Sequence, residues 1–428
     1  MNYREFGVKH KCHTLKNGSI IRLLGRKGAP IHIQACIHAG SRYNSIPGQA
    51  HFLEHMLVSG SRSFPTKLSL SSALEQVGGS FDAVTDPDFI RITVSIPHKR
   101  HLDLAVNILN EILTAALHES SLFENEKSVI LSEINEKRRN IPLYLMNSLM
   151  NLAFVDYTLH FNGLGTKESV SAMNIEDVTK HAKENITSSK TIYVVSGDIE
   201  MEEISASLSI IKLPNDLKDA QIELPKQNNV NHFIYENKDS EQTDILIGFR
   251  CDTNSLEDFV GLLLIQQMFM GRRSPFIQKL RYERGLVYGG SATLWDFFDT
   301  SIFGVRTASS PENIKEVFDT ILNIINQTQI EGVRGDEFEI LKIKTEGFYR
   351  FSLQTSREWL DAETTIIRHN RDRSDDSNAL DILSCIQEMN IHTINEILKK
   401  YFSLNNAYCV VLGSLSNETI EHIQKILY

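Results

Sequence analysis

The chain has 428 residues, of which 41% are hydrophobic and 23% are charged, so it can bury large cores and is too long for one ordinary domain. Its formal net charge of −10, without a basic patch, argues against a nucleic-acid partner and favours basic or neutral peptides. The sequence contains no run of about 18 apolar residues, so we expect no membrane span.

The N-terminus and the cysteines indicate the compartment. Residues 1–6 contain no apolar stretch typical of a secretory signal, and the early Glu5 is atypical of an organellar presequence. The five cysteines are odd in number and widely spaced, which indicates a reducing environment. We therefore expect a cytoplasmic protein. No cysteine has a motif around it that is typical of a catalytic nucleophile.

An apolar strand is expected at residues 31–38, and the helix expected after it carries the sequence His-x-x-Glu-His at residues 51–55. On a helix, His51 and His55 lie one turn apart and can hold one zinc ion, while Glu54 can act as a base. About 0.07 chance matches to this motif are expected in a chain of this composition. An amphipathic helix with two surface histidines is the alternative.

Two segments downstream bear on this motif. Residues 80–85 follow a double glycine and are typical of a hairpin strand. Residues 123–140 predict a charged helix, on which Glu126 and Glu133 lie two turns apart on one face. Two histidines and one glutamate form a known catalytic zinc set that leaves one position open for water. A third ligand is therefore available, although a solvated charged face is the alternative for both glutamates.

The second half of the chain repeats the pattern of the first. Strand-like segments that begin at 191 and 407 are 216 residues apart, and those that begin at 31 and 243, and at 89 and 301, are 212 residues apart. This spacing indicates a duplication. The predicted fold is α+β: two homologous α/β-sandwich halves, at 1–213 and 230–428, joined by a linker at 214–229.

The second half has no metal motif of its own. At an offset of 212 residues the motif is replaced by Leu-Leu-Ile-Gln-Gln at 263–267, which offers no cation ligand. This half instead carries Arg281 and Tyr288, seven residues apart. A guanidinium and a phenol can stabilise the oxyanion that forms when a peptide carbonyl is attacked. The alternative is a surface arginine beside a tyrosine that packs on a strand.

Together these motifs resemble the pitrilysin family of inverted-motif zinc peptidases, in its branch with two-domain subunits. The resemblance covers nearly the whole chain and rests on residues 39–43, 51–56, 126, 133, 281 and 288. It implies one zinc ion per subunit, held by His51, His55 and Glu133. It also implies that Glu126 supports the zinc ligands without binding the metal itself. Glu54 would be the general base, and Arg281 and Tyr288 would complete the active site.

The resemblance further implies how a peptide would bind. In the family an extended substrate pairs with the strand that here contains Phe81, Asp82, Ala83 and Val84, through main-chain hydrogen bonds. The chain departs from the family at Asp82, where asparagine is usual, so a side-chain donor becomes an acceptor. An ordinary hairpin strand is compatible with the same residues.

The resemblance implies a clam-like chamber made by two subunits, in which Arg281 and Tyr288 serve the zinc of the partner chain. Because this chain carries both the metal-binding residues and the pair Arg281 and Tyr288, we expect a homodimer. A heterodimer with a metal-free relative is the alternative assembly. The expected activity is zinc-dependent endopeptidase cleavage of short unstructured peptides or of leader and targeting segments. A non-catalytic scaffold subunit is the alternative, and the presence of every motif residue weighs against it.

Overall fold

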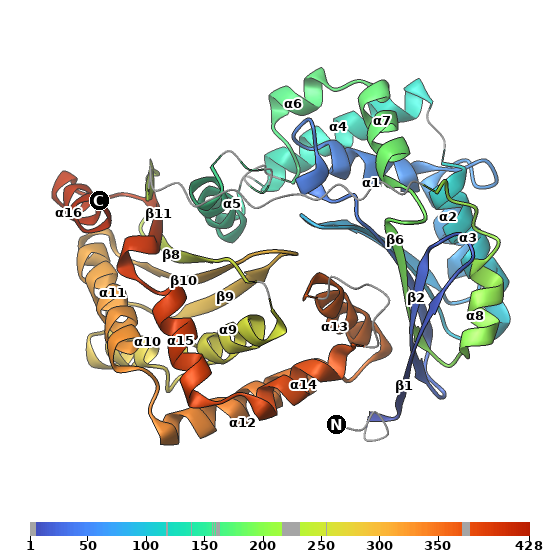
Figure 1. Cartoon of the computed structure of the whole chain (residues 1–428). Helices are drawn as coiled ribbons and strands as arrows, with labels where there is room; N and C mark the ends of the chain where they lie inside the picture. Colours follow the sequence, from blue (N-terminus) through green and yellow to red (C-terminus); the bar gives the residue numbers. More distant parts are fainter. Residues whose placement is uncertain are drawn as a thin grey trace. The chain divides into compact units, whose positions relative to one another are not determined.

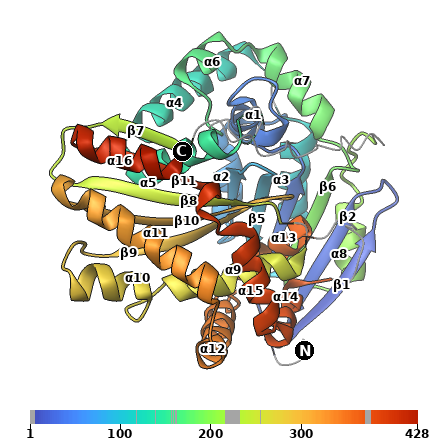
Figure 2. The ribbon, with the colours of Figure 1, turned by 60° about the vertical axis from the view of Figure 1, so that its left-hand side comes forward.

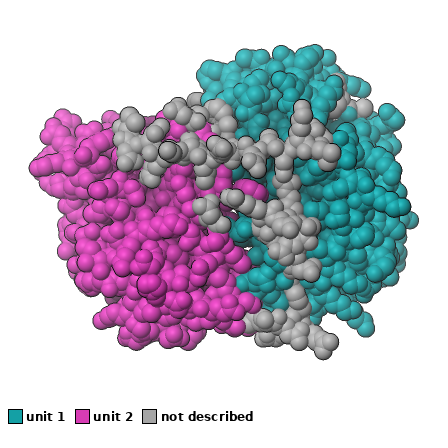
Figure 3. All heavy atoms as spheres, in the orientation of Figure 1, with its two compact units in different colours: residues 1–136, 161–223, 351–381 teal, residues 137–160, 224–350, 382–428 magenta. Residues whose placement is uncertain are grey.

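The computed structural model of the chain describes residues 6–116, 119–137, 139–155, 157, 159, 163–215, 232–253, 255–369 and 377–428. Only the first two residues of the predicted linker at 214–229 belong to this described part. The chain divides into two compact units (Figure 3): unit 1 comprises 1–136, 161–223 and 351–381, and unit 2 comprises 137–160, 224–350 and 382–428. The predicted domain boundaries at 213 and 230 stay a prediction.

Unit 1 is built on a six-stranded sheet with the order β1-β2-β6-β3-β5-β4. Figures 1 and 2 show β1, β2 and β6 of this sheet side by side. The strands are β1 (Val8–Thr14), β2 (Ile20–Arg26), β3 (Ile31–Ile37), β4 (Ser80–Thr85), β5 (Ile90–Ile96) and β6 (Thr191–Gly197). β2 and β6 run parallel, and the other neighbours are antiparallel. Alternation along β3 sends Ile33 and Ala35 into the core and Gln34 and Cys36 to the opposite face.

Helices cover both faces of this sheet. Seven of them pack on the apolar face and contribute to one core: α1 (Gln49–Ser59), α2 (Lys67–Glu75), α3 (Leu102–Thr114), α4 (Ser120–Lys137), α6 (Lys167–Ala172), α7 (Ile175–Asn185) and α8 (Met201–Leu208). Helix α13 (Ser356–His369) contacts β3 and β6 from the other face. This helix belongs to the second half of the sequence.

Unit 2 is built on a five-stranded sheet with the order β7-β11-β8-β10-β9. Its strands are β7 (Phe233–Asn237), β8 (Thr243–Cys251), β9 (Gly290–Asp296), β10 (Ser301–Ser309) and β11 (Ala407–Gly413). Its helices are α5 (Ile141–Ala153), α9 (Leu256–Phe269), α10 (Pro275–Ile277), α11 (Ile314–Glu331), α12 (Gly335–Phe351), α15 (Ile391–Tyr401) and α16 (Asn417–Leu427). Helix α14 (Ala379–Glu388) contributes residues to both units.

The two sheets share one arrangement of five strands. β6 lies between β2 and β3 and is parallel to β2, just as β11 lies between β7 and β8 and is parallel to β7. The order β3-β5-β4 in unit 1 matches β8-β10-β9 in unit 2. The predicted α+β fold of two similar halves is therefore confirmed. Among the described residues, no helix combines the length and the apolar character that a membrane span needs.

Helices α5 and α13 are equivalents in this duplication. They begin at residues 141 and 356, an interval close to that of the repeated strands. Within unit 2, α5 packs on β8 and β11, and within unit 1, α13 packs on β3 and β6. Each sheet is therefore covered on one face by a helix from the other half of the sequence.

Candidate metal centre

Helix α1 carries the His-x-x-Glu-His sequence, and the residues before it explain where the helix begins. Gly48 precedes the helix with φ of 92°, a left-handed conformation that glycine adopts without strain. The side-chain oxygen of Asn44 accepts a hydrogen bond from the Ala50 amide at 2.8 Å. The contact provides a hydrogen-bond acceptor for one of the first backbone amides of the helix, which have no acceptor within the helix itself.

Helix α4 is held against α1 by apolar contacts. The rings of Phe52 and Phe123 stack with their centroids 4.5 Å apart. Ile130 and Ile134 of α4 are buried in the same core. Because these residues recur at helical spacing, α4 presents Glu126 and Glu133 along the side that borders α1.

Three candidate metal ligands converge between these helices. The Glu133 Oε2 atom lies 3.6 Å from Nε2 of His51 and 3.6 Å from Nε2 of His55. The candidate ligand atoms all lie within 4.8 Å of one another, and the described residues hold no second such group of three. Ligands of a tetrahedral zinc ion at about 2.0–2.1 Å are separated by roughly 3.3 Å. The donor types and their spacing therefore fit a zinc ion.

Glu126 is not one of the three candidate ligands but orients one of them, His55. Its Oε2 atom is 2.8 Å from Nδ1 of His55. A carboxylate accepts hydrogen bonds, so Nδ1 donates the proton and Nε2 keeps the lone pair that a metal requires. Carboxylates that hold a histidine in this way commonly accompany zinc sites.

Glu126→Gln is expected to lower the zinc affinity about 10- to 100-fold, because the amide accepts a weaker hydrogen bond from His55 and no longer holds the ring as firmly. Zinc affinity would be measured by competition with a chromophoric chelator. Glu124→Gln on the same helix is the matched control, since Glu124 pairs with Lys127 at 3.3 Å and is exposed. Equal affinities of both variants and the wild type would rule out this role of Glu126.

Glu54 borders the metal ligands and the end of strand β4. Burial raises the pKa of its carboxyl, and the charge of Glu133 adds to this shift, while the nearby polar groups of Thr85 and the charge of His55 oppose it. A zinc ion at the site would also favour the charged carboxylate. Glu54 thus lies beside the ligand group, on a helix that packs against β4.

Strand β4 contains the four residues predicted to bind substrate: Phe81, Asp82, Ala83 and Val84. β4 is at the end of the sheet order, so one of its edges pairs with β5 and no described strand pairs with the other. Phe81 and Ala83 pack against the core. The Asp82 side chain points to the opposite face, where its Oδ2 atom accepts a hydrogen bond of 2.9 Å from Arg357 of α13.

The turn at Asp86-Pro87-Asp88, which follows β4, is not among the site residues predicted from the sequence. Its carbonyls accept hydrogen bonds from the amides of Gly40, Ser41 and Arg42, at 3.3, 3.0 and 2.9 Å. A Cβ atom at Gly40 would lie 2.4 Å from the carbonyl oxygen of Asp86, so the close approach requires glycine. The Asp-Pro-Asp sequence is itself a turn signal that could have drawn attention to this place.

Arg281 and Tyr288 lie in unit 2 and contact each other. The Arg281 guanidinium is 4.8 Å from the centroid of the Tyr288 ring and 5.6 Å from that of Tyr282. Arg281 belongs to a π-helical segment, η5 (Gln278–Glu283), a rare conformation that is frequent at functional sites. Tyr288 as a residue is 85% exposed, so it is accessible to a ligand or to another chain.

Two family models match the chain. Residues 29–167 match the model described as Insulinase (Peptidase family M16), and residues 172–345 match the Peptidase M16 inactive domain. The first match contains all five residues of the candidate metal centre, and the second contains Arg281 and Tyr288.

Several relatives have similar sequences. An uncharacterised zinc protease of Mycobacterium leprae is 25% identical over 322 residues, which cover 74% of this chain and 72% of that protein. The mitochondrial-processing peptidase subunit beta of Dictyostelium discoideum is 28% identical over 341 residues, which cover 74% and 71% of the two chains.

Solved structures show the same fold at lower identity. A protease from Helicobacter pylori superposes with a TM-score of 0.84 at 18% identity, covering 95% of this chain and 99% of that one. A peptidase M16 inactive domain from Pseudomonas fluorescens superposes with a TM-score of 0.86 at 14% identity, covering 95% and 98%.

Proposed function

Because the chain belongs to the M16 (insulinase) family of peptidases, we propose that it is a zinc-dependent endopeptidase that cleaves short, unstructured peptides or leader segments. The observation that carries this proposal is the convergence of His51, His55 and Glu133 beside Glu54. Relatives named as zinc proteases and as a processing peptidase support the same class of reaction. A scaffold role is not favoured, because every residue of the motif set is present.

The proposed site divides the chemistry between metal and protein. Zinc at this ligand set would polarise the scissile carbonyl and lower the pKa of water bound to it. Glu54 would accept the proton of the attacking water and pass it to the leaving amine. Glu126 would hold His55 in the tautomer that binds metal.

Peptide binding is assigned to the open edge of β4. Main-chain groups along this edge can pair with an extended peptide and add a strand to the sheet. Pairing of this kind depends little on the substrate's side chains, which suits an enzyme that accepts several unstructured peptides. Folded proteins have few free strands to offer and would be poor substrates.

Arg281 and Tyr288 are assigned to the oxyanion of the transition state, as hydrogen-bond donors supplied by the second subunit of a homodimer. Support comes from their mutual contact and from the exposure of Tyr288. A heterodimer with a metal-free relative is the other assembly that would bring such a pair to the zinc.

We assign the protein to the cytoplasm.

Removal of the metal is expected to abolish hydrolysis, because the site would lose the group that activates both water and carbonyl. The purified protein would be assayed for zinc content and for cleavage of a quenched-fluorescent peptide library, before and after chelation and after zinc is added back. Cleavage that is lost with the chelator and regained with zinc would support the proposal. Cleavage that survives complete removal of zinc would reject it, and so would a protein that binds no zinc.

A further inference from the structure

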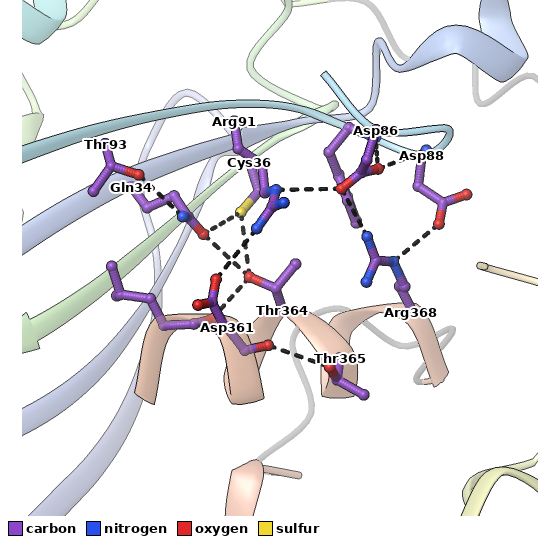
Figure 4. Close-up of polar contacts among 12 residues, drawn as sticks. Gln34, Cys36, Asp86, Asp88, Arg91, Thr93, Asp361, Thr364, Thr365 and Arg368 are labelled. Atoms are coloured by element: carbon purple, nitrogen blue, oxygen red, sulfur yellow. Dashed lines mark hydrogen bonds and ion pairs between the residues drawn. The ribbon is translucent and has the colours of Figure 1, made fainter. Parts of the chain in front are cut away.

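Helix α13 offers one polar face to the sheet of unit 1. Arg357, Asp361, Thr364 and Arg368 follow a spacing of four, three and four residues, which places them on one side of the helix. Figure 4 shows Asp361, Thr364 and Arg368 of this face against residues of β3 and β5 and of the turn after β4. The helix therefore contacts the layer that carries the candidate peptide-binding strand, on the face opposite to the metal centre.

Two arginines of α13 reach β4 and its turn at different points. Arg357 donates to Asp82 in the middle of β4 at 2.9 Å. Arg368 donates from Nη2 to Asp86 at 2.7 Å and from Nε to Asp88 at 3.0 Å. The two pairs differ in burial, since Asp82 is 52% exposed and Asp88 only 1%. Loss of the Arg368 contacts should therefore perturb the structure more than loss of the Arg357 contact.

The turn that Arg368 holds is organised by the same aspartates. The Oδ1 atom of Asp86 accepts hydrogen bonds from the amides of Asp88 and Phe89 at 2.8 and 2.9 Å, and its Oδ2 atom accepts from Arg368. Asp88 is shared between Arg368 and Arg42, whose Nε atom lies 3.0 Å from Oδ1 of Asp88. One guanidinium thus binds both acidic side chains of the turn.

This turn is connected to the candidate metal centre in two ways. Its carbonyls accept hydrogen bonds from the amides of residues 40–42, in the loop that leads into α1. Strand β4, which ends at Thr85 directly before the turn, packs against α1, the helix that carries Glu54. A displacement of the turn would therefore disturb both the loop that leads into α1 and the strand that packs against this helix.

We propose that α13 positions the reaction site from the opposite face of the sheet: Arg368 fixes the turn at 86–88 and, through the loop at 40–42 and strand β4, the helix that carries Glu54, whereas Arg357 fixes the peptide-binding stretch of β4 through Asp82. This inference rests on the proposed function. Neither arginine touches the reacting atoms, so both are positioning residues. Because Arg368 contacts the turn and Arg357 contacts β4, loss of Arg368 should mainly affect turnover, and loss of Arg357 should mainly affect substrate binding.

Arg368→Gln is expected to lower kcat about 10- to 100-fold with bound zinc retained, since small misplacements of catalytic groups are costly. Arg357→Gln is expected to raise KM several-fold and leave kcat unchanged. Arg368→Lys should restore part of the loss, because lysine keeps the charge but cannot bind two carboxylates with a planar fork. Arg334→Gln, at an exposed ion pair with Glu337 in unit 2, is the matched control.

Hydrogen–deuterium exchange provides a readout that does not depend on hydrolysis. The amides of residues 40–42 and 86–89 should exchange faster in Arg368→Gln than in the wild type, and at wild-type rates in Arg334→Gln. If the wild type hydrolyses no peptide but these amides still respond, the proposed function fails while the coupling from α13 to the site stands. Unchanged exchange would overturn the coupling itself.

Kinetic outcomes can overturn the inference as well. A folded, zinc-loaded Arg368→Gln with wild-type kcat would refute the role of Arg368, and wild-type KM in Arg357→Gln would refute the role of Arg357. If Arg368→Gln does not fold, Arg368→Lys tests the contact with a smaller change, and Asp86→Asn weakens it together with the ion pair between Asp86 and Arg91 at 3.2 Å. In that case full kcat in both variants would refute the role of Arg368.

Discussion

Glu54→Gln is expected to keep zinc bound and to lower kcat about 10²- to 10⁴-fold, the usual contribution of a general acid and base. The amide has almost the same size as the carboxylate but cannot accept a proton from water. Glu54 is outside the candidate ligand group of His51, His55 and Glu133, so its replacement leaves that group intact. The variant should therefore separate metal binding from turnover.

The test compares three proteins. Zinc content would be determined by elemental analysis, and kcat with a quenched peptide, for the wild type, Glu54→Gln and His51→Ala. His51→Ala should lose both zinc and activity, because two protein ligands hold the ion far less well than three. Glu124→Gln, an exposed residue of α4, is the control for the change from acid to amide. Full activity of Glu54→Gln would refute its role as the base.

Mixing two inactive variants is expected to restore activity if Arg281 and Tyr288 act on the zinc of the partner subunit. His51→Ala lacks the metal, and Tyr288→Phe should lose about 10²- to 10³-fold in kcat through the missing oxyanion donor. A mixed dimer would combine the intact metal centre of one subunit with the intact tyrosine of the other. Random mixing would yield about one quarter of the wild-type number of complete sites, and purified mixed dimers about one half.

The experiment requires dimers whose composition is known. The two variants would carry different affinity tags, and mixed dimers would be isolated by sequential purification after co-expression. Dimers of each variant alone are the controls and should stay inactive at the sensitivity of the assay. Mixed dimers without recovered activity would show that the pair does not act across the dimer. A monomer in sedimentation equilibrium would contradict the proposed assembly directly.

The group of candidate metal ligands could be predicted from sequence because its members follow helical spacing. His51 and His55 are one turn apart, Glu126 and Glu133 are two turns apart, and a helix fixes which side chains share a face. The same reasoning identified the duplication, since strands at a constant interval reflect repeated local structure. The order of the strands in each sheet then follows the duplication closely.

What the sequence by itself determined was therefore local: the α+β class, the repeat and the candidate ligands on their two helices. Tertiary structure alone decided which sheet α13 covers and that Arg357 and Arg368 meet Asp82 and the 86–88 turn. These partners are more than 270 residues apart in the chain. Their contacts depend on burying a whole helix against a sheet, and neither periodicity nor spacing encodes such a pairing.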